Sequence, residues 1–169
     1  MGTLSQELVK QYSDILRLLS PKPYLGTRKS KNLFELEFAE VENIRRNIKT
    51  SEGVLKAMSV FFDCEEKLLV DYRIIQFYHA FNHLLSQIEH LENIERANLH
   101  SKPKQDMIEA GIKNLDRFGA LNILDSLAMD YGKSPTEIEK WSYGLVYSLL
   151  WKRKVQSDID ENYREAQKK

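Results

Sequence analysis

The fold of this chain is decided by residues 118–151, which read FGALNILDSLAMDYGKSPTEIEKWSYGLVYSLLW. Apolar residues recur at helical spacing from Phe118 to Met129, and the pattern breaks at residues 131–135. It restarts as a short helix that ends near Trp141. A small residue at Ala128, a glycine at Gly132 and apolar residues at Ile138 and Trp141 fit two helices that cross at a tight turn. The stretch therefore predicts a helix-turn-helix unit.

A long terminal helix follows this unit. Ser142 can cap a helix that runs to about Gln167, which would be about 39 Å long. Its first half is apolar on most faces, whereas its second half keeps only Val155, Ile159 and Tyr163 among charged residues. A stripe this thin does not hold a helix by itself, so we expect a partner to cover it, either a helical protein client or another copy of the chain.

Eight residues of this terminal helix are the predicted partner-binding site. The aromatic side chains at four-residue intervals share one face, and the basic residues lie where that face meets the charged tail. The predicted residues are Tyr143, Tyr147, Trp151, Lys152, Arg153, Lys154, Val155 and Ile159. The alternative is that the aromatic residues pack on Ile138 and Trp141 inside the same chain.

The rest of the chain also shows helical patterns. Apolar residues from Leu4 to Leu19 predict a first helix, which the prolines of the loop Ser20–Asn32 would stop. Residues 33–49 are expected to form one helix, because the alternation at residues 34–38 has no second strand to pair with. Another helix should span residues 52–62, capped by Thr50 or Ser51.

The strongest periodicity of apolar residues follows the helix predicted for residues 52–62. Its apolar residues form a heptad seam along one long helix: Val70, Ile74, Phe77, Phe81, Leu84, Ile88 and Leu91. We expect the last five of these to be buried. Apolar residues from Met107 to Leu127 then predict one further helix.

These patterns together predict an all-α protein, an irregular helical bundle with a C-terminal helix-turn-helix unit and a long terminal helix. We divide it into residues 1–32 (an N-terminal helix and loop), 33–100 (a helical core) and 101–169 (a C-terminal helical module).

Composition restricts the function. Lys+Arg and Asp+Glu both number 25, so the formal net charge is zero, whereas nucleic-acid-binding proteins usually carry a basic excess. The single cysteine excludes an intramolecular disulfide and favours a reducing compartment. We expect no membrane span, because no apolar run reaches about 18 residues. Residues 1–7 lack the pattern of a signal peptide.

Three groups of residues are candidates for chemistry. His79, His83 and His90 share one side of a helix, but they lie at f and c positions of the heptad, so we expect surface histidines and no metal. Cys64 lies between carboxylates, which raise the pKa of a thiol and make it a poor nucleophile. An acidic run has no base or nucleophile placed beside it: Glu35, Glu37, Glu40 and Glu42. We therefore predict no enzyme activity and no cofactor.

DNA binding is the alternative that the helix-turn-helix unit raises. A recognition helix must face phosphates and base edges. This one presents Glu137 and Glu139 against a single Lys140, and phosphate would repel these carboxylates. The charge therefore disfavours a DNA-binding regulator, and a structural virion or interaction protein is the other alternative.

The segment FGALNILDSLAMDYGKSPTEIEKWSYGLVYSLLWKRKVQSDI, residues 118–159, resembles the C-terminal module of tail assembly chaperones of long-tailed bacteriophages. The segments LFELEFAEVENI, residues 33–44, and FYHAFNHLL, residues 77–85, resemble the front half of some members. The resemblance implies a non-enzymatic, oligomeric assembly factor in the cytoplasm of an infected bacterium. Its client would be the helical tape-measure protein, whose apolar stripes need a cover before the tail tube forms.

Overall fold

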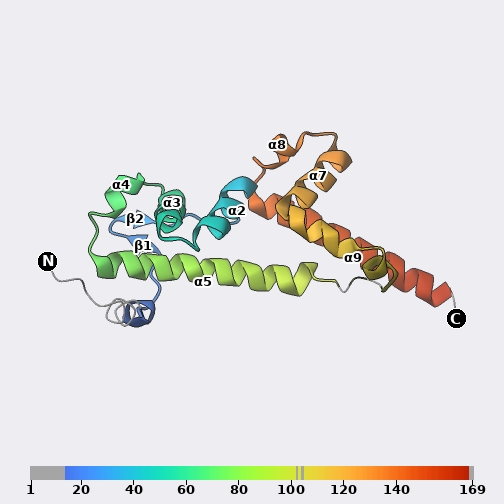
Figure 1. Ribbon diagram of the computed structural model, residues 1–169, viewed down its shortest axis with the longest axis horizontal. Helices are drawn as coiled ribbons and strands as arrows, with labels where there is room; N and C mark the ends of the chain where they lie inside the picture. Colours follow the sequence, from blue (N-terminus) through green and yellow to red (C-terminus); the bar gives the residue numbers. More distant parts are fainter. Residues whose placement is uncertain (1–13, 102, 104, 168–169) are drawn as a thin grey trace. The chain divides into compact units, whose positions relative to one another are not determined.

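The computed structural model describes residues 14–101, 103 and 105–167, and the fold is all-α, as the sequence predicts. The residues Asp14–Arg17 are helical, and most of the predicted first helix lies outside the described residues. The named elements follow in chain order (Figure 1): β1 Tyr24–Leu25, β2 Arg28–Lys29, α2 Phe38–Asn47, α3 Ser51–Phe62, α4 Glu66–Leu69, α5 Ile74–Leu99, α6 Gln105–Glu109, the 3-10 helix η1 Ile112–Phe118, α7 Ala120–Tyr131, α8 Pro135–Ile138 and α9 Tyr143–Gln167.

The contacts divide the chain into two compact units. Of the described residues, the first unit comprises 14–32 and 43–91, and the second comprises 33–42 and those from 92 to 167. Helices α2 and α5 each contribute residues to both units. The division of the sequence into three domains stays a prediction.

In the first unit, the predicted loop at residues 20–32 contains a small β-hairpin. Strands β1 and β2 pair antiparallel, and Gly26 takes the left-handed conformation (φ 62°) that the turn requires. Figure 1 shows this hairpin and the helical turn of residues 14–17 on opposite sides of α5. Asn82 of α5 holds that turn, because its side-chain amide donates to the backbone oxygens of Leu16, Arg17 and Leu19.

Helix α3 supplies much of the first core. Thr50 caps it as predicted, since its hydroxyl oxygen accepts from the Gly53 N–H at 3.1 Å. Asp63 ends it in the left-handed conformation. The buried apolar side chains of the unit are Leu25, Ile44, Ala57, Met58, Phe61, Phe62, Leu69, Ala80, Leu84, Ile88 and Leu91.

The predicted seam of α5 is only partly a core. Leu84, Ile88 and Leu91 are buried, whereas Phe77 and Phe81 are half-buried, stacking on each other with ring centroids 6.2 Å apart. Val70 and Ile74 are 70 % and 61 % exposed. The predicted burial is thus confirmed for Leu84, Ile88 and Leu91 and was wrong for Phe77 and Phe81, which lie in the first turns of α5 near its exposed start. The seam also does not extend back to Val70, because α5 begins only at Ile74.

The second unit contains the helix-turn-helix and the terminal helix where the sequence predicts them. The chain turns back between α7 and α8 (Figure 1), with Gly132 left-handed at φ 60°. Ala128 and Ile138 are buried, and the Tyr131 and Trp141 rings meet edge to face at 5.5 Å. The second core also draws on residues before α2 and in its first turns. Its buried apolar side chains are Leu33, Leu36, Phe38, Val41, Leu124, Leu127, Ala128, Ile138, Tyr143, Val146 and Tyr147.

Residues 33–36 form a turn and a bend, Glu37 lies in a β-bridge, and none of them belongs to the helix that the sequence predicts over 33–49. Glu37 forms an antiparallel bridge with Ser142, and the N–H groups of Tyr143 and Gly144 donate to the oxygens of Leu36 and Phe34 at 2.8 and 2.9 Å. The segment that pairs with these residues is thus the start of α9, which the sequence pattern did not identify as their partner.

The single helix expected from Met107 to Leu127 is divided into α6, η1 and α7. Gly111 and Gly119 stand at the two breaks with φ values of 86° and 50°, a backbone region that favours glycine. The division leaves large apolar side chains of this segment exposed: Met107, Ile108, Leu115, Phe118 and Leu121.

Candidate partner-binding surface

The first half of α9 is part of the second core. Tyr143 stacks on Phe38 with ring centroids 5.8 Å apart and meets Phe34 edge to face at 6.1 Å. Tyr147 also meets the Phe34 ring, at 5.9 Å, and its hydroxyl accepts from the Asn98 side-chain amide at 2.7 Å. These two tyrosines are therefore not part of the exposed surface. Both tyrosines pack inside the same chain, as in the alternative interpretation, but their ring partners are Phe34 and Phe38.

The second half of α9 exposes an apolar stripe. Trp151, Val155, Ile159 and Tyr163 are 46 %, 45 %, 55 % and 65 % exposed, and they follow one another at four-residue intervals. Residues at this spacing share one face of a helix. We call these four residues the α9 stripe. Tyr163 joins the predicted residues because its exposure continues the same face.

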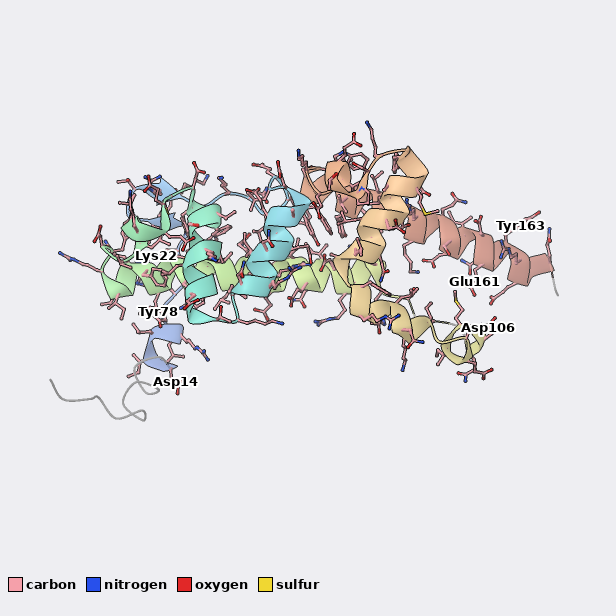
Figure 2. All side chains as sticks on the ribbon, turned by 45° about the horizontal axis from the view of Figure 1, so that its top comes forward. Asp14, Lys22, Tyr78, Asp106, Glu161 and Tyr163 are labelled. Atoms are coloured by element: carbon pink, nitrogen blue, oxygen red, sulfur yellow. The ribbon has the colours of Figure 1, made fainter. Side chains whose placement is uncertain are left out.

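The opposite side of α9 is turned toward α6. Asp106 and Met107 of α6 line an open hollow of about 600 Å³ together with polar residues of α9: Arg153, Gln156, Ser157, Asp160, Glu161 and Arg164. Figure 2 shows Glu161 on the side of Asp106 and Tyr163 on the opposite side of α9. The α9 stripe is therefore not covered by α6.

The three basic residues at the start of the tail differ in their contacts. Arg153 reaches α7, where it donates to the Ser126 hydroxyl at 2.8 Å and pairs with Asp130. Lys154 pairs with Asp158 one turn further along α9, and Lys152 is exposed. Arg153 thus ties α9 to α7, whereas Lys152 and Lys154 remain at the edges of the stripe.

A second apolar surface lies over η1 and α7. Leu115, Phe118 and Leu121 line a shallow groove of about 350 Å³ with Asn122 and Asp125. The Arg117 guanidinium lies 4.8 Å from the centre of the Phe118 ring. The sequence reasoning missed this surface because it placed these residues on one core helix. The signal that could have revealed it is the pair of glycines, Gly111 and Gly119.

The candidate histidines of α5 hold the hairpin segment. His79 Nδ1 lies 2.6 Å from the Ser20 backbone oxygen, and His83 Nε2 lies 3.2 Å from the Ser30 hydroxyl. Both rings are half-buried, so the expectation of surface histidines was wrong for these two, because residues 20–30 pack over them. Burial lowers the pKa of His83 below its ordinary 6.5. His90 is exposed, as expected.

The pKa of Cys64 is raised, mainly by burial and only secondarily by the neighbouring Asp63, while Arg28 opposes the shift. The sequence predicted the direction and gave the carboxylates as its cause. Asp63 itself pairs with Lys31 at 2.8 Å, and its backbone oxygen accepts from Arg28 at 2.8 Å. These contacts fix the turn after α3.

The helix-turn-helix unit has a short second helix of four residues. Ser134 and Glu137 form a capping box at its start, and Lys133 pairs with Glu137 at 3.1 Å. Hydrogen bonds from Ser134 and Lys133 lower the pKa of Glu137 to about 2, so this exposed carboxylate stays charged. The face that would meet DNA therefore carries a charged carboxylate, which is paired with Lys133.

No family model, no curated protein and no solved structure matches this chain. Within the described residues, no group of three or more histidine, cysteine, aspartate or glutamate side chains could hold a metal ion. No described helix is long and apolar enough to cross a membrane.

Proposed function

We propose that the protein is a non-enzymatic assembly factor that binds a helical protein client through the α9 stripe. The observation that carries the proposal is the exposure of Trp151, Val155, Ile159 and Tyr163 along one face of a continuous helix. Apolar residues at four-residue steps are the means by which two helices, or a helix and a groove, recognise each other. A tryptophan and a tyrosine at the two ends supply large apolar area with few rotatable bonds.

We further propose that the client is a phage tape-measure protein and that the chain works as a tail assembly chaperone in the cytoplasm of the infected bacterium. The resemblance of residues 118–159 to the C-terminal module of that family supports this identity. A long, helical client with unpaired apolar stripes needs a cover of the kind that the α9 stripe provides.

The proposal gives the protein no catalytic role. Shifted pKa values often indicate active sites, but structural contacts shift them as well. Here Glu137 is held in a helix cap, Asp63 in a turn, and His83 under a packed loop. Each of these shifts has a structural cause, and none of the groups faces another as acid and base.

DNA binding remains the other candidate, favoured only by the geometry of the α7–α8 turn. The charged Glu137 at the start of α8 and the burial of Ile138 oppose it. A gel-shift titration at low salt is expected to show no binding to duplex DNA. A complex that weakens steeply as salt rises would favour this candidate instead.

Co-expression tests the proposed client. A tape-measure protein of a long-tailed phage is produced in a bacterial host with and without the chain, and its soluble fraction is measured. The chain should raise that fraction and co-purify with the client. A matched control uses two double variants, Val155→Glu with Ile159→Glu on the stripe and Met129→Glu with Leu145→Glu on exposed positions elsewhere. Loss of the effect only with the stripe variant supports the proposal, and equal binding by both variants contradicts it.

A further inference from the structure

Residues 14–21 of the first unit lie across one side of α5. The chain is helical from Asp14 to Arg17 and leaves the helix over the next four residues. Figure 1 shows this turn on the side of α5 opposite the β-hairpin. In the part of the chain that the structure describes, every hydrogen bond from residues 14–22 to another element ends on α5. We call residues 14–21 the α5 strap.

Two side chains of α5 anchor the strap. The Asn82 amide nitrogen donates to the backbone oxygens of Leu16, Arg17 and Leu19 at 3.2, 3.2 and 2.7 Å. His79 Nδ1 lies 2.6 Å from the Ser20 backbone oxygen and must be the donor, because a carbonyl oxygen only accepts. The last carbonyl oxygens of a helix have no partners within that helix. The anchors therefore hold the strap by capping the end of its helical turn.

Apolar burial contributes little to this contact. None of the strap residues is buried, and Ile15 and Leu18 are 60 % and 85 % exposed. The hairpin that follows is held differently, because Leu25 is fully buried and the Lys31 N–H donates to the Phe61 oxygen at 2.8 Å. A segment held by hydrogen bonds without buried apolar side chains opens at low free-energy cost, since water replaces those bonds. The strap and the hairpin should therefore differ widely in local stability.

We propose that the α5 strap opens while the rest of the first unit stays folded, and that it thereby controls access to the side of α5 on which it lies. The hinge is the bond from the Lys22 N–H to the His79 oxygen at 3.0 Å, because the hairpin begins directly after it. This proposal does not involve the α9 stripe. Its tests use the chain without a client, so their outcome is separate from that of the client experiment.

Opening exposes a row of side chains on α5. Tyr78, Asn82 and Leu85 share one face of the helix, since they are four and three residues apart. The strap lines an open hollow of about 500 Å³ together with residues of this face, among them Asn82 and Leu85. Asn82 is only 7 % exposed, and Tyr78 is half-buried, with its ring 6.1 Å from that of Phe81. The closed strap thus covers an amide, a leucine and the edge of an aromatic cluster.

Native-state hydrogen exchange resolved by NMR tests the opening. The Leu18 and Leu19 amides report on the strap, and the Lys31 amide reports on the hairpin. The strap amides should be protected about a hundredfold less than Lys31, and dilute urea should hardly change their rates, because opening exposes little surface. Equal protection of all three amides overturns the proposal. Strap amides that exchange as fast as in a free peptide also overturn it, because the strap would then not close.

An Asn82→Asp substitution tests the anchor. Aspartate has the shape of asparagine but donates no hydrogen bond, and its charge would face three carbonyl oxygens. Protection of the Leu18 and Leu19 amides should fall at least about tenfold, while that of Lys31 and the circular dichroism stay unchanged. Asn93→Asp, the same change at an exposed position of α5, should alter neither reporter. If Asn82→Asp lowers the protection of Lys31 as much as that of the strap, the strap is part of the folded core and the proposal fails.

A fluorescent dye tests the control of access. 8-Anilinonaphthalene-1-sulfonate brightens when it binds exposed apolar surface, so its emission should rise about twofold or more in Asn82→Asp. Adding Leu85→Glu to that variant should lower the emission again, because the substitution places a charge on the uncovered face. Asn93→Asp should give the emission of the parent. Unchanged emission in Asn82→Asp, when hydrogen exchange shows its strap to be open, would mean that the strap covers no accessible apolar face and would overturn its role.

Discussion

Two residues of α9, Tyr143 and Ile159, should differ sharply in their effect on stability. Tyr143 is 3 % exposed and clamped between the rings of Phe38 and Phe34, whereas Ile159 is 55 % exposed. Truncating a buried aromatic residue to alanine costs about 3–5 kcal/mol. Two ring contacts place Tyr143→Ala toward the upper end of that range. Ile159→Ala should change the free energy of unfolding by less than about 0.5 kcal/mol, as surface substitutions usually do.

Urea titration followed by tryptophan fluorescence measures this difference within one unit. The only two tryptophans, Trp141 and Trp151, both belong to the second unit, so the signal reports on the core that holds Tyr143. The titration should be run at a concentration where Ile159→Ala and the parent have the same oligomeric state, because association would add to the free energy of unfolding. A loss below about 1 kcal/mol for Tyr143→Ala, or equal losses for the two variants, would refute the division of α9 into a core half and an exposed half.

Three further outcomes are expected. Gly53→Ala should destabilise the first unit by about 1–3 kcal/mol in a urea titration, because its Cβ would lie 2.1 Å from the Asn47 backbone oxygen; a neutral effect would contradict this packing. Burial lowers the pKa of His83 in the folded protein, so the unfolded chain binds the proton more readily. The neutral His83 should therefore contribute to stability above pH 6.5, and this contribution should be lost as pH falls below that value. If the melting temperature varies with pH in the same way in the parent and in His83→Gln, this prediction is contradicted. A chelator should leave the melting temperature unchanged, because His79 and His83 are bound to Ser20 and Ser30; a large loss of helicity would show a metal site.

Local signals in the sequence predicted the parts of the fold that depend on neighbouring residues. Thr50 caps α3, and Gly132 turns the chain between α7 and α8. Ser142 accepts from the Leu145 N–H at the start of α9, which is helical through Gln167, the last residue that the structure describes. Each of these features is decided within about one helical turn, so a single sequence contains enough information to place it.

Features that depend on distant residues were not predicted. The sequence pattern of residues 34–37 fits both a helix and a strand, but hydrogen bonds to residues 142–144 hold them in a turn that ends in a single β-bridge. The half-buried state of His79 and His83 depends on how residues 20–30 fold over α5. The partner-binding surface was only partly predicted for the same reason. The spacing of residues 143–159 predicts one stripe, but its first half is covered by the rings of Phe34 and Phe38, which are distant in the sequence.

The central claim is that the exposed half of α9 binds a partner and contributes little to the core. Deleting residues 155–169 tests it, with light scattering and circular dichroism on the same sample. The account predicts a truncated chain that keeps the helicity of its remaining residues and its melting transition but loses self-association, because residues 155–167 are all exposed in the isolated chain. A truncated chain that unfolds, or one that assembles as the full chain does, would contradict it.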